Sequence, residues 1–332
     1  MPTVAQAAQS LAQLLTGGSH QLSAPGGSGS ELEFLTEIVP RPLRRTGPPP
    51  DCWAVDGGQA LVADARCIQV AVTRAARARW QSGACTLEEE GEANVHVLVG
   101  DGGGSQARSS LSEMGAPVAP GSPVDLNLLR DWSEWRLVQR CTEEAEPGAL
   151  VLVDGDLQPD WRIPAAWLGQ LLSRAAQLGV HLVGVTKHSS LARGDAPLVG
   201  QLELEAEALL GSRACWWAPV ARTRPDVGPG LLVVVARLDP DARFAFRVDL
   251  VGDAAEGADV DELLGTLSAL SDDAAFPGYP YPLSVADRLS ACPGWLREEV
   301  RAELDTALDA AGVALDVRER AFTDRHRLME RA

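Results

Sequence analysis

The sequence predicts an α/β protein built on one mixed β-sheet, and three observations support this prediction. First, three apolar or alternating runs follow one another with short breaks, which is typical of an antiparallel meander. These runs are residues 52–56, 67–80 and 94–100. Second, residues 124–145 show the apolar period of a helix. Third, apolar runs at 149–154 and 180–187 flank a helical segment, and such a unit calls for parallel strands.

The remaining segments fit this order. Asp125 is a suitable N-cap for the first long helix, and residues 100–110 have the glycine-rich composition of a loop. Two later runs predict a hairpin and three more predict helices. They are 230–239 and 243–252 for the hairpin, then 259–270, 284–291 and 295–312 for the helices. A meander, a helix and a parallel strand pair in this order are typical of the ribonuclease H-like fold.

We expect two parts in the chain. Residues 1–48 comprise a predicted helix over 1–17 and a glycine- and serine-rich connector, which we expect to make partner or dimer contacts. Residues 49–332 form the main domain, with a C-terminal helical region from about residue 255. The stretch between residues 190 and 230, in which we expect the apolar "CWWAPV" to be exposed, is a second candidate for partner contacts.

Composition narrows the classes of function. The formal charge of -17 argues against a protein that coats nucleic acid with a uniformly positive surface, but it leaves room for a local basic track. The six cysteines include no CxxC pair, so neither a zinc site nor a disulfide framework is indicated. No apolar run approaches the roughly 20 residues of a membrane helix, and the start of the chain lacks a basic secretory signal. We therefore expect a cytoplasmic protein.

Two Asp-Gly pairs carry the first indication of chemistry. Asp56 and Asp154 each follow a predicted strand, and in a sheet of this topology the two strand ends lie side by side. Carboxylate oxygens suit Mg²⁺ or Mn²⁺ better than zinc. Two such ions can activate a water and stabilise the leaving oxygen of a phosphodiester.

A third carboxylate is expected from the helix between these strands. Glu134 shares a helical stripe with apolar residues and should point inward, while Asp131 and Glu143 are alternatives. The competing interpretation is that Glu134 only pairs with Arg130 one turn earlier.

Four motifs in order resemble the NurA nucleases, which process DNA ends in partnership with the HerA hexameric helicase. The motifs are "WAVDGG", "LVLVDGDL", "VGVTKHSS" and "GYPYPLSVADR", spread over roughly residues 50–290. They contain the only lysine, Lys187, and both tyrosines, Tyr279 and Tyr281. The resemblance implies that Asp56, Glu134 and Asp154 bind catalytic manganese ions. It also implies that Lys187 contacts the scissile phosphate or the oxyanion that develops on it, and that Tyr279 or Tyr281 binds a phosphate or stacks on a base.

The sequence departs from the family pattern at several positions. Asp287 stands where the family has a histidine, and a carboxylate can replace imidazole as a manganese ligand. His326, in the last predicted helix, is an alternative source of the imidazole. Gly58 and Asp156 replace family serines; Asp156 either adds negative charge near the metal or only solvates the turn.

The resemblance implies a manganese-dependent DNA nuclease, with Mg²⁺ a weaker cofactor. It would act as a 5′ to 3′ exonuclease and single-strand endonuclease in DNA end resection. It would form a homodimer docked on a HerA-type hexameric ATPase. Two other functions stay open at this point. One is a non-catalytic DNA clamp or adaptor for the ATPase, and the other is an actin-like or sugar-kinase phosphotransferase, which would need a second glycine-rich nucleotide loop.

Overall fold

The computed structural model describes residues 3–16, 21–24, 32–100, 102–223, 230–251 and 257–323. Most strands belong to one mixed sheet of eleven strands, in the order β2-β12-β13-β14-β9-β8-β4-β5-β6, with β3 on β12 and β7 on β5. A small second sheet consists of β1 (Leu22–Ser23), β10 (Ala192–Arg193) and β11 (Ala196–Pro197). The predicted α/β class with a ribonuclease H-like mixed sheet is confirmed.

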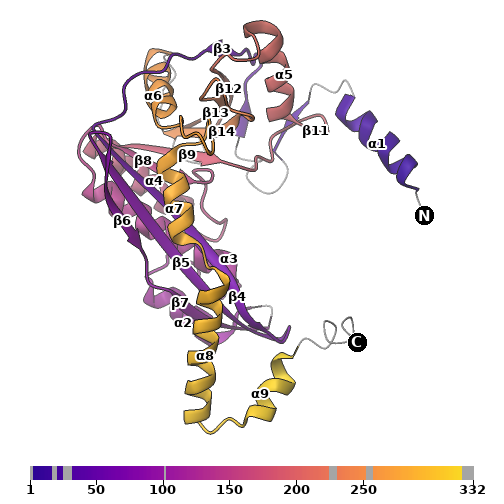
Figure 1. The fold of residues 1–332 in the computed structure, drawn as a ribbon, viewed down its shortest axis with the longest axis vertical. Helices are drawn as coiled ribbons and strands as arrows, with labels where there is room; N and C mark the ends of the chain where they lie inside the picture. Colours follow the sequence, from indigo (N-terminus) through magenta and orange to yellow (C-terminus); the bar gives the residue numbers. More distant parts are fainter. Residues whose placement is uncertain are drawn as a thin grey trace.

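The centre of the sheet is a long hairpin joined to two parallel strands. The strands are β4 (Asp51–Asp64), β5 (Ile68–Gln81), β8 (Leu150–Asp154) and β9 (His181–Thr186). β4 pairs antiparallel with β5 along almost its whole length, but it pairs with β8 only from Cys52 to Val55. The hairpin therefore extends beyond β8, as Figure 1 shows, and β6 (Ala84–Glu90) and β7 (Asn94–Val99) continue the meander on β5.

Antiparallel strands extend the sheet beyond β9. They are β14 (Phe246–Val251), β13 (Leu231–Arg237) and β12 (Trp216–Thr223), with β2 (Leu32–Phe34) and β3 (Arg41–Pro42) on the outer edge of β12. Branched apolar residues fill β13, which is buried on both faces, and this composition is typical of an interior strand. The predicted hairpin at 230–252 is confirmed.

Helices cover both faces of the sheet. On one face lie α3 (Leu126–Glu144) and α4 (Ala165–Leu178), whose side chains pack with Trp53 and Val55 of β4. On the other lie α6 (Gly257–Ala269) and α7 (Tyr281–Ser290), which pack with Cys52 and Ala54. α8 (Gly294–Ala310) follows α7 along the hairpin and leads to α9 (Leu315–Phe322), while α1 (Val4–Thr16) stands apart from the sheet (Figure 1).

Several local predictions were wrong. Part of the stretch taken as a loop at 100–110 belongs to α2 (Gly104–Glu113), whose buried Ala107 and Leu111 pack against the sheet. The first strand does not end at Asp56, because pairing with β5 continues to Asp64. Before residue 49 the chain is more than a helix and a connector, since β2 and β3 pair with β12.

The "CWWAPV" stretch is also not the exposed surface that we expected. Trp216 and Trp217 lie in β12 and are each 2% exposed. α5 (Leu198–Leu210) covers part of the same region, and its Leu198 and Leu202 pack on β12. Among the residues described, no helix has the length and apolarity that a membrane crossing requires.

Candidate active site

Strand alternation places three polar side chains on one face of the sheet. Val55 and Val153 pack against α3 and α4, so their successors Asp56 and Asp154 point to the opposite face, toward α7. Lys187 follows β9 and continues the row of Val183 and Val185, which also face α7. Asp56 stands where β8 stops pairing with β4, so the carboxyl end of β8 meets the middle of β4.

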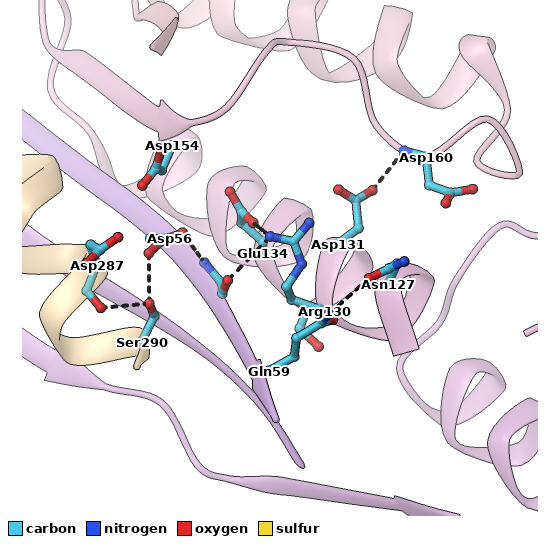
Figure 2. Close-up of polar contacts among 12 residues, drawn as sticks. Asp56, Gln59, Asn127, Arg130, Asp131, Glu134, Asp154, Asp160, Asp287 and Ser290 are labelled. Carbon is cyan, nitrogen blue, oxygen red and sulfur yellow. Dashed lines mark hydrogen bonds and ion pairs between the residues drawn. The ribbon is translucent and has the colours of Figure 1, made fainter. Parts of the chain in front are cut away.

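Three carboxylates meet at this point. Asp56 and Asp154 come from the sheet, and Asp287 comes from α7 (Figure 2). One oxygen from each of these three side chains lies within 4.8 Å of the others. We call this set the acidic cluster. Asp56 is buried, Asp154 is half-buried and the Asp287 side chain is 55% exposed, so the cluster opens to solvent on the α7 side.

Asp56 is held on both oxygens. The Gly57 backbone N–H donates to Oδ1 at 2.7 Å, and the Ser290 hydroxyl donates to Oδ2 at 2.8 Å. Burial and the negative charge of Asp154 nonetheless raise the pKa of Asp56 to about 6. Ser290 was not predicted, and no sequence pattern points to it, because its contact with Asp56 joins residues 234 apart.

The two glycines after Asp56 are required by close approach from both faces. A Cβ on Gly57 would lie 2.8 Å from Glu134 Oε2, on the α3 side. A Cβ on Gly58 would lie 2.0 Å from the Ser290 carbonyl oxygen, on the α7 side. Gly58 therefore allows the end of α7 to rest directly on β4.

Lys187 bridges two members of the acidic cluster. Its Nζ lies 2.6 Å from Asp154 Oδ2 and 2.6 Å from Asp287 Oδ1. Burial opposes its charge, but the hydrogen bonds to these two carboxylates outweigh burial and raise the pKa of Lys187. Burial also raises the pKa of Asp154, and the hydrogen bond from Lys187 opposes this effect only in part. The side chain of Lys187 is still 38% exposed, so a ligand can reach its ammonium group.

Only one of the two tyrosines lies at the acidic cluster. Tyr279 is 6% exposed, and Lys187 Nζ lies 5.1 Å from the centre of its ring. Burial and the charge of Asp154 raise the pKa of its hydroxyl, which has no hydrogen-bond partner of normal geometry among the described residues. Tyr281 instead packs edge-on against Trp80, with ring centroids 5.5 Å apart, in the core beneath α7.

Glu134 reaches the acidic cluster from the other face. It is 3% exposed on α3, so the prediction that it points inward is confirmed (Figure 2). Burial, and then the charge of Asp56, raise its pKa well above the usual range. Arg130 Nη1 lies 3.9 Å from Glu134 Oε2, so the pairing with Arg130 is present as well.

The other predicted acids lie elsewhere. Asp131 accepts a hydrogen bond from the Asp160 backbone N–H at 2.8 Å, and Glu143 is exposed on α3. Asp156 pairs with Arg247 of β14 at 3.2 Å. His326 lies outside the described residues.

The donor set of the acidic cluster fits a hard divalent cation. Its three carboxylates carry more negative charge than the single ammonium of Lys187 can balance, and all of their donor atoms are oxygen. Magnesium and manganese prefer such ligands. The unpartnered Tyr279 hydroxyl beside the cluster is a buried polar group that a bound anion or water would satisfy.

A cavity of about 670 Å³ lies at the other end of the parallel strands, away from the acidic cluster. Leu150 and His181, where β8 and β9 begin, line it together with Pro48, Pro49 and Pro50. It does not touch the acidic cluster, so we do not assign it to the same chemistry.

Comparison with known proteins supports the fold. No protein-family model matches the chain, and no curated protein matches its sequence. The chain is similar to the crystal structure of the NurA nuclease from Sulfolobus solfataricus, with 18% identity, coverage of 82% of this chain and 88% of that chain, and a TM-score of 0.52. Another NurA crystal structure has 9% identity, coverage of 74% and 86%, and a TM-score of 0.44. The catalytic domain of human Endonuclease V has 20% identity, coverage of 81% and 92%, and a TM-score of 0.40. The chain thus has a NurA-like fold.

Proposed function

We propose that the protein is a metal-dependent DNA nuclease that hydrolyses phosphodiester bonds at the acidic cluster. The observation that carries this proposal is the meeting of Asp56, Asp154 and Asp287, from three separate elements, beside Lys187 and the unpartnered hydroxyl of Tyr279. The NurA-like fold supports it, because the similar Sulfolobus protein is named as a nuclease.

Each residue has a role in this proposal. Asp56, Asp154 and Asp287 hold the metal, with Glu134 behind Asp56 as a further ligand or as a group that orients it. The bound divalent ions, two in our proposal, supply an activated water and charge stabilisation for the leaving oxygen. Lys187 leaves its carboxylate partners for the phosphate, and the Tyr279 hydroxyl donates a hydrogen bond to a phosphate oxygen. Ser290 positions Asp56.

The finer parts of the proposal follow the resemblance in sequence. We propose manganese as the preferred ion, with magnesium weaker, and 5′ to 3′ exonuclease and single-strand endonuclease activities in DNA end resection. We also propose a homodimer that docks on a HerA-type hexameric ATPase. A local basic track for DNA would need unpaired cations. The arginine-rich strand β5 does not supply them, because each of its arginines pairs with a carboxylate; these are Arg74, Arg77 and Arg79.

The experiment is cleavage of 5′-labelled single-stranded DNA with Mn²⁺, Mg²⁺ or chelator, comparing the parent protein with Asp154→Asn. This substitution keeps the size of the side chain and removes the charge that a metal needs. We expect cleavage that requires the metal and is lost in the variant. If the parent protein, alone and with an ATPase partner, leaves the DNA intact under every condition, the nuclease proposal is wrong and the clamp becomes the better account.

A further inference from the structure

A cavity of about 610 Å³ opens beside the acidic cluster and shares three residues with it. Lys187, Tyr279 and Asp287 form part of its wall. The rest of the wall comes from residues 241–246 at the start of β14, from residues 275–277 and from Ser284 of α7. A DNA strand with one phosphate bound at the acidic cluster would therefore have this cavity next to that phosphate.

The walls of this cavity are unusually rich in aromatic residues for this chain. The protein has five phenylalanines, and Phe244, Phe246 and Phe276 all line the cavity. Phe244 is 56% exposed and Phe276 is 65% exposed. Phe246 packs on Tyr279, with ring centroids 5.4 Å apart. Two aromatic side chains are thus held open to solvent, where hydrophobic burial by a ligand would stabilise the complex.

Two cationic side chains, Lys187 and Arg243, line the same cavity. The Arg243 guanidinium lies 5.1 Å from the centre of the Phe244 ring, and Lys187 forms another part of the wall. Within the described part of the chain, no carboxylate pairs with Arg243. A ligand that combines a flat apolar ring with negative phosphates matches both the aromatic surface and these two cations.

We propose that this cavity is a nucleobase subsite that takes one unpaired base of the strand whose phosphate lies at the acidic cluster. This inference rests on the proposed nuclease function and deepens it by assigning the residues that hold one base of the strand. The faces of a base inside a duplex are covered by its neighbours, so only an unstacked base can face Phe244 and Phe276. Stacking on aromatic rings accepts every base. The substrate is therefore single-stranded DNA or a frayed end, taken with little sequence preference.

The test measures binding of labelled single-stranded DNA, with Ca²⁺ in place of Mn²⁺ so that binding is read separately from cleavage. We compare the parent protein with Phe244→Ala and Phe276→Ala, and with Leu204→Ala as a control. Leu204 is 71% exposed on α5, away from the cavity. Each phenylalanine variant should bind about 5- to 150-fold more weakly, which is the usual effect of losing one stacked base. The control should bind like the parent, and all thermal midpoints should agree because these side chains are exposed.

A second set of strands locates the base. A single abasic nucleotide is moved along the strand, and one position should weaken binding to the parent protein. That penalty should be smaller in Phe276→Ala, because one of the two stacking partners, Phe276, is already missing. Blunt duplex DNA should bind the parent and the variants about equally.

The outcomes separate the two proposals. If the phenylalanine variants bind like the parent while the parent cleaves DNA, the subsite is wrong and the nuclease function stands. If the variants lose binding but no metal supports cleavage, the subsite stands and the protein is a binding module. Equal losses on single strands and blunt duplexes would contradict the unpaired base.

Discussion

Asp154 and Asp156 lie two residues apart at the end of β8, yet they belong to two groups of carboxylates that are paired with different cations. Asp156 and Asp249 both contact the buried Arg247, and we call these three residues the Arg247 group. Arg247 contacts Asp249 through Nε at 2.8 Å and through Nη2 at 2.8 Å. Asp249 also accepts a hydrogen bond from the Leu157 backbone N–H at 3.2 Å. Asp154 belongs to the acidic cluster, where three carboxylates share one lysine.

The difference separates a structural group from the group that we propose to be functional. In the Arg247 group, a delocalised cation and a backbone donor satisfy a carboxylate that is 0% exposed. In the acidic cluster, excess negative charge is kept near the surface, and a nearby hydroxyl has no partner. The second arrangement leaves ligand positions that an incoming ion or phosphate can fill. A raised pKa does not by itself separate the two groups, because burial and the charge of Asp249 also raise the pKa of Asp156 to about 6.

The largest effect on stability is expected from breaking the Arg247 group. Arg247→Met leaves Asp249 buried without its cation, which should lower the free energy of unfolding by about 3–5 kcal/mol. Chemical denaturation measures the change. If the single variant does not fold, Arg247→Met combined with Asp249→Leu should recover a folded protein. An Arg247→Met protein as stable as the parent would contradict the structural role.

Replacing Lys187, which bridges two carboxylates of the acidic cluster, should affect DNA cleavage strongly and stability only slightly. Lys187→Met should slow DNA cleavage about 100-fold, because a cation that faces the phosphate is lost. Its free energy of unfolding should change by only about 1 kcal/mol, since Lys187 and Asp287 are both partly exposed. Single-turnover cleavage and denaturation on the same sample give both numbers. A large loss of stability with unchanged cleavage would place Lys187 with the structural residues.

The pH dependence of stability should identify Asp56 as a member of the acidic cluster. Its pKa is 3.8 as a free group and about 6 when folded, so the metal-free protein loses stability as pH rises from about 4 through 6. Asp56→Asn should therefore stabilise the metal-free protein by about 1–3 kcal/mol at pH 7.5, where the Asp56 carboxylate is charged. At pH 4 the difference should largely vanish. Thermal unfolding in chelator at the two pH values checks this, and an advantage that is equal at both would contradict the raised pKa.

The smallest effect is expected at the two tyrosines. Tyr279→Phe removes a buried hydroxyl that lies beside Asp154, so cleavage should slow about tenfold, while the free energy of unfolding should change by no more than about 1 kcal/mol. Tyr281→Phe is the matched control, because the Tyr281 ring packs on Trp80 away from the acidic cluster. It should leave cleavage unchanged. Cleavage rates that fall equally in both variants would remove the special role of Tyr279.

The parts of the fold that the sequence predicts are those with strong local periodicity. The apolar runs of β8, β9 and β13 and the amphipathic pattern of α4 predict their elements directly. β12 was misinterpreted because two adjacent tryptophans resemble an exposed patch, and they are covered only once β3 and α5 pack around them. Periodicity also does not show that β4 continues past Asp56, because Gly57 and Gly58 interrupt the apolar run.

The site was predictable where position in a strand fixes direction. Asp154 and Lys187 end neighbouring strands, and alternation alone sends both to one face. The choice between Tyr279 and Tyr281, the role of Gly58 and the contact of Ser290 depend on where α7 lies over β4. That placement is set by packing between residues more than 200 positions apart, which no local pattern reports.

We infer that the acidic cluster around Asp154 binds a divalent ion and that the Arg247 group beside it does not. The most direct test is Mn²⁺ binding, followed by electron paramagnetic resonance, in the parent protein, Asp154→Asn and Asp156→Asn. These two substitutions remove the same charge two residues apart. We expect that Asp154→Asn abolishes saturable Mn²⁺ binding and that Asp156→Asn binds Mn²⁺ within about threefold of the parent. Equal binding by the parent and Asp154→Asn, or loss of binding in Asp156→Asn alone, would contradict it.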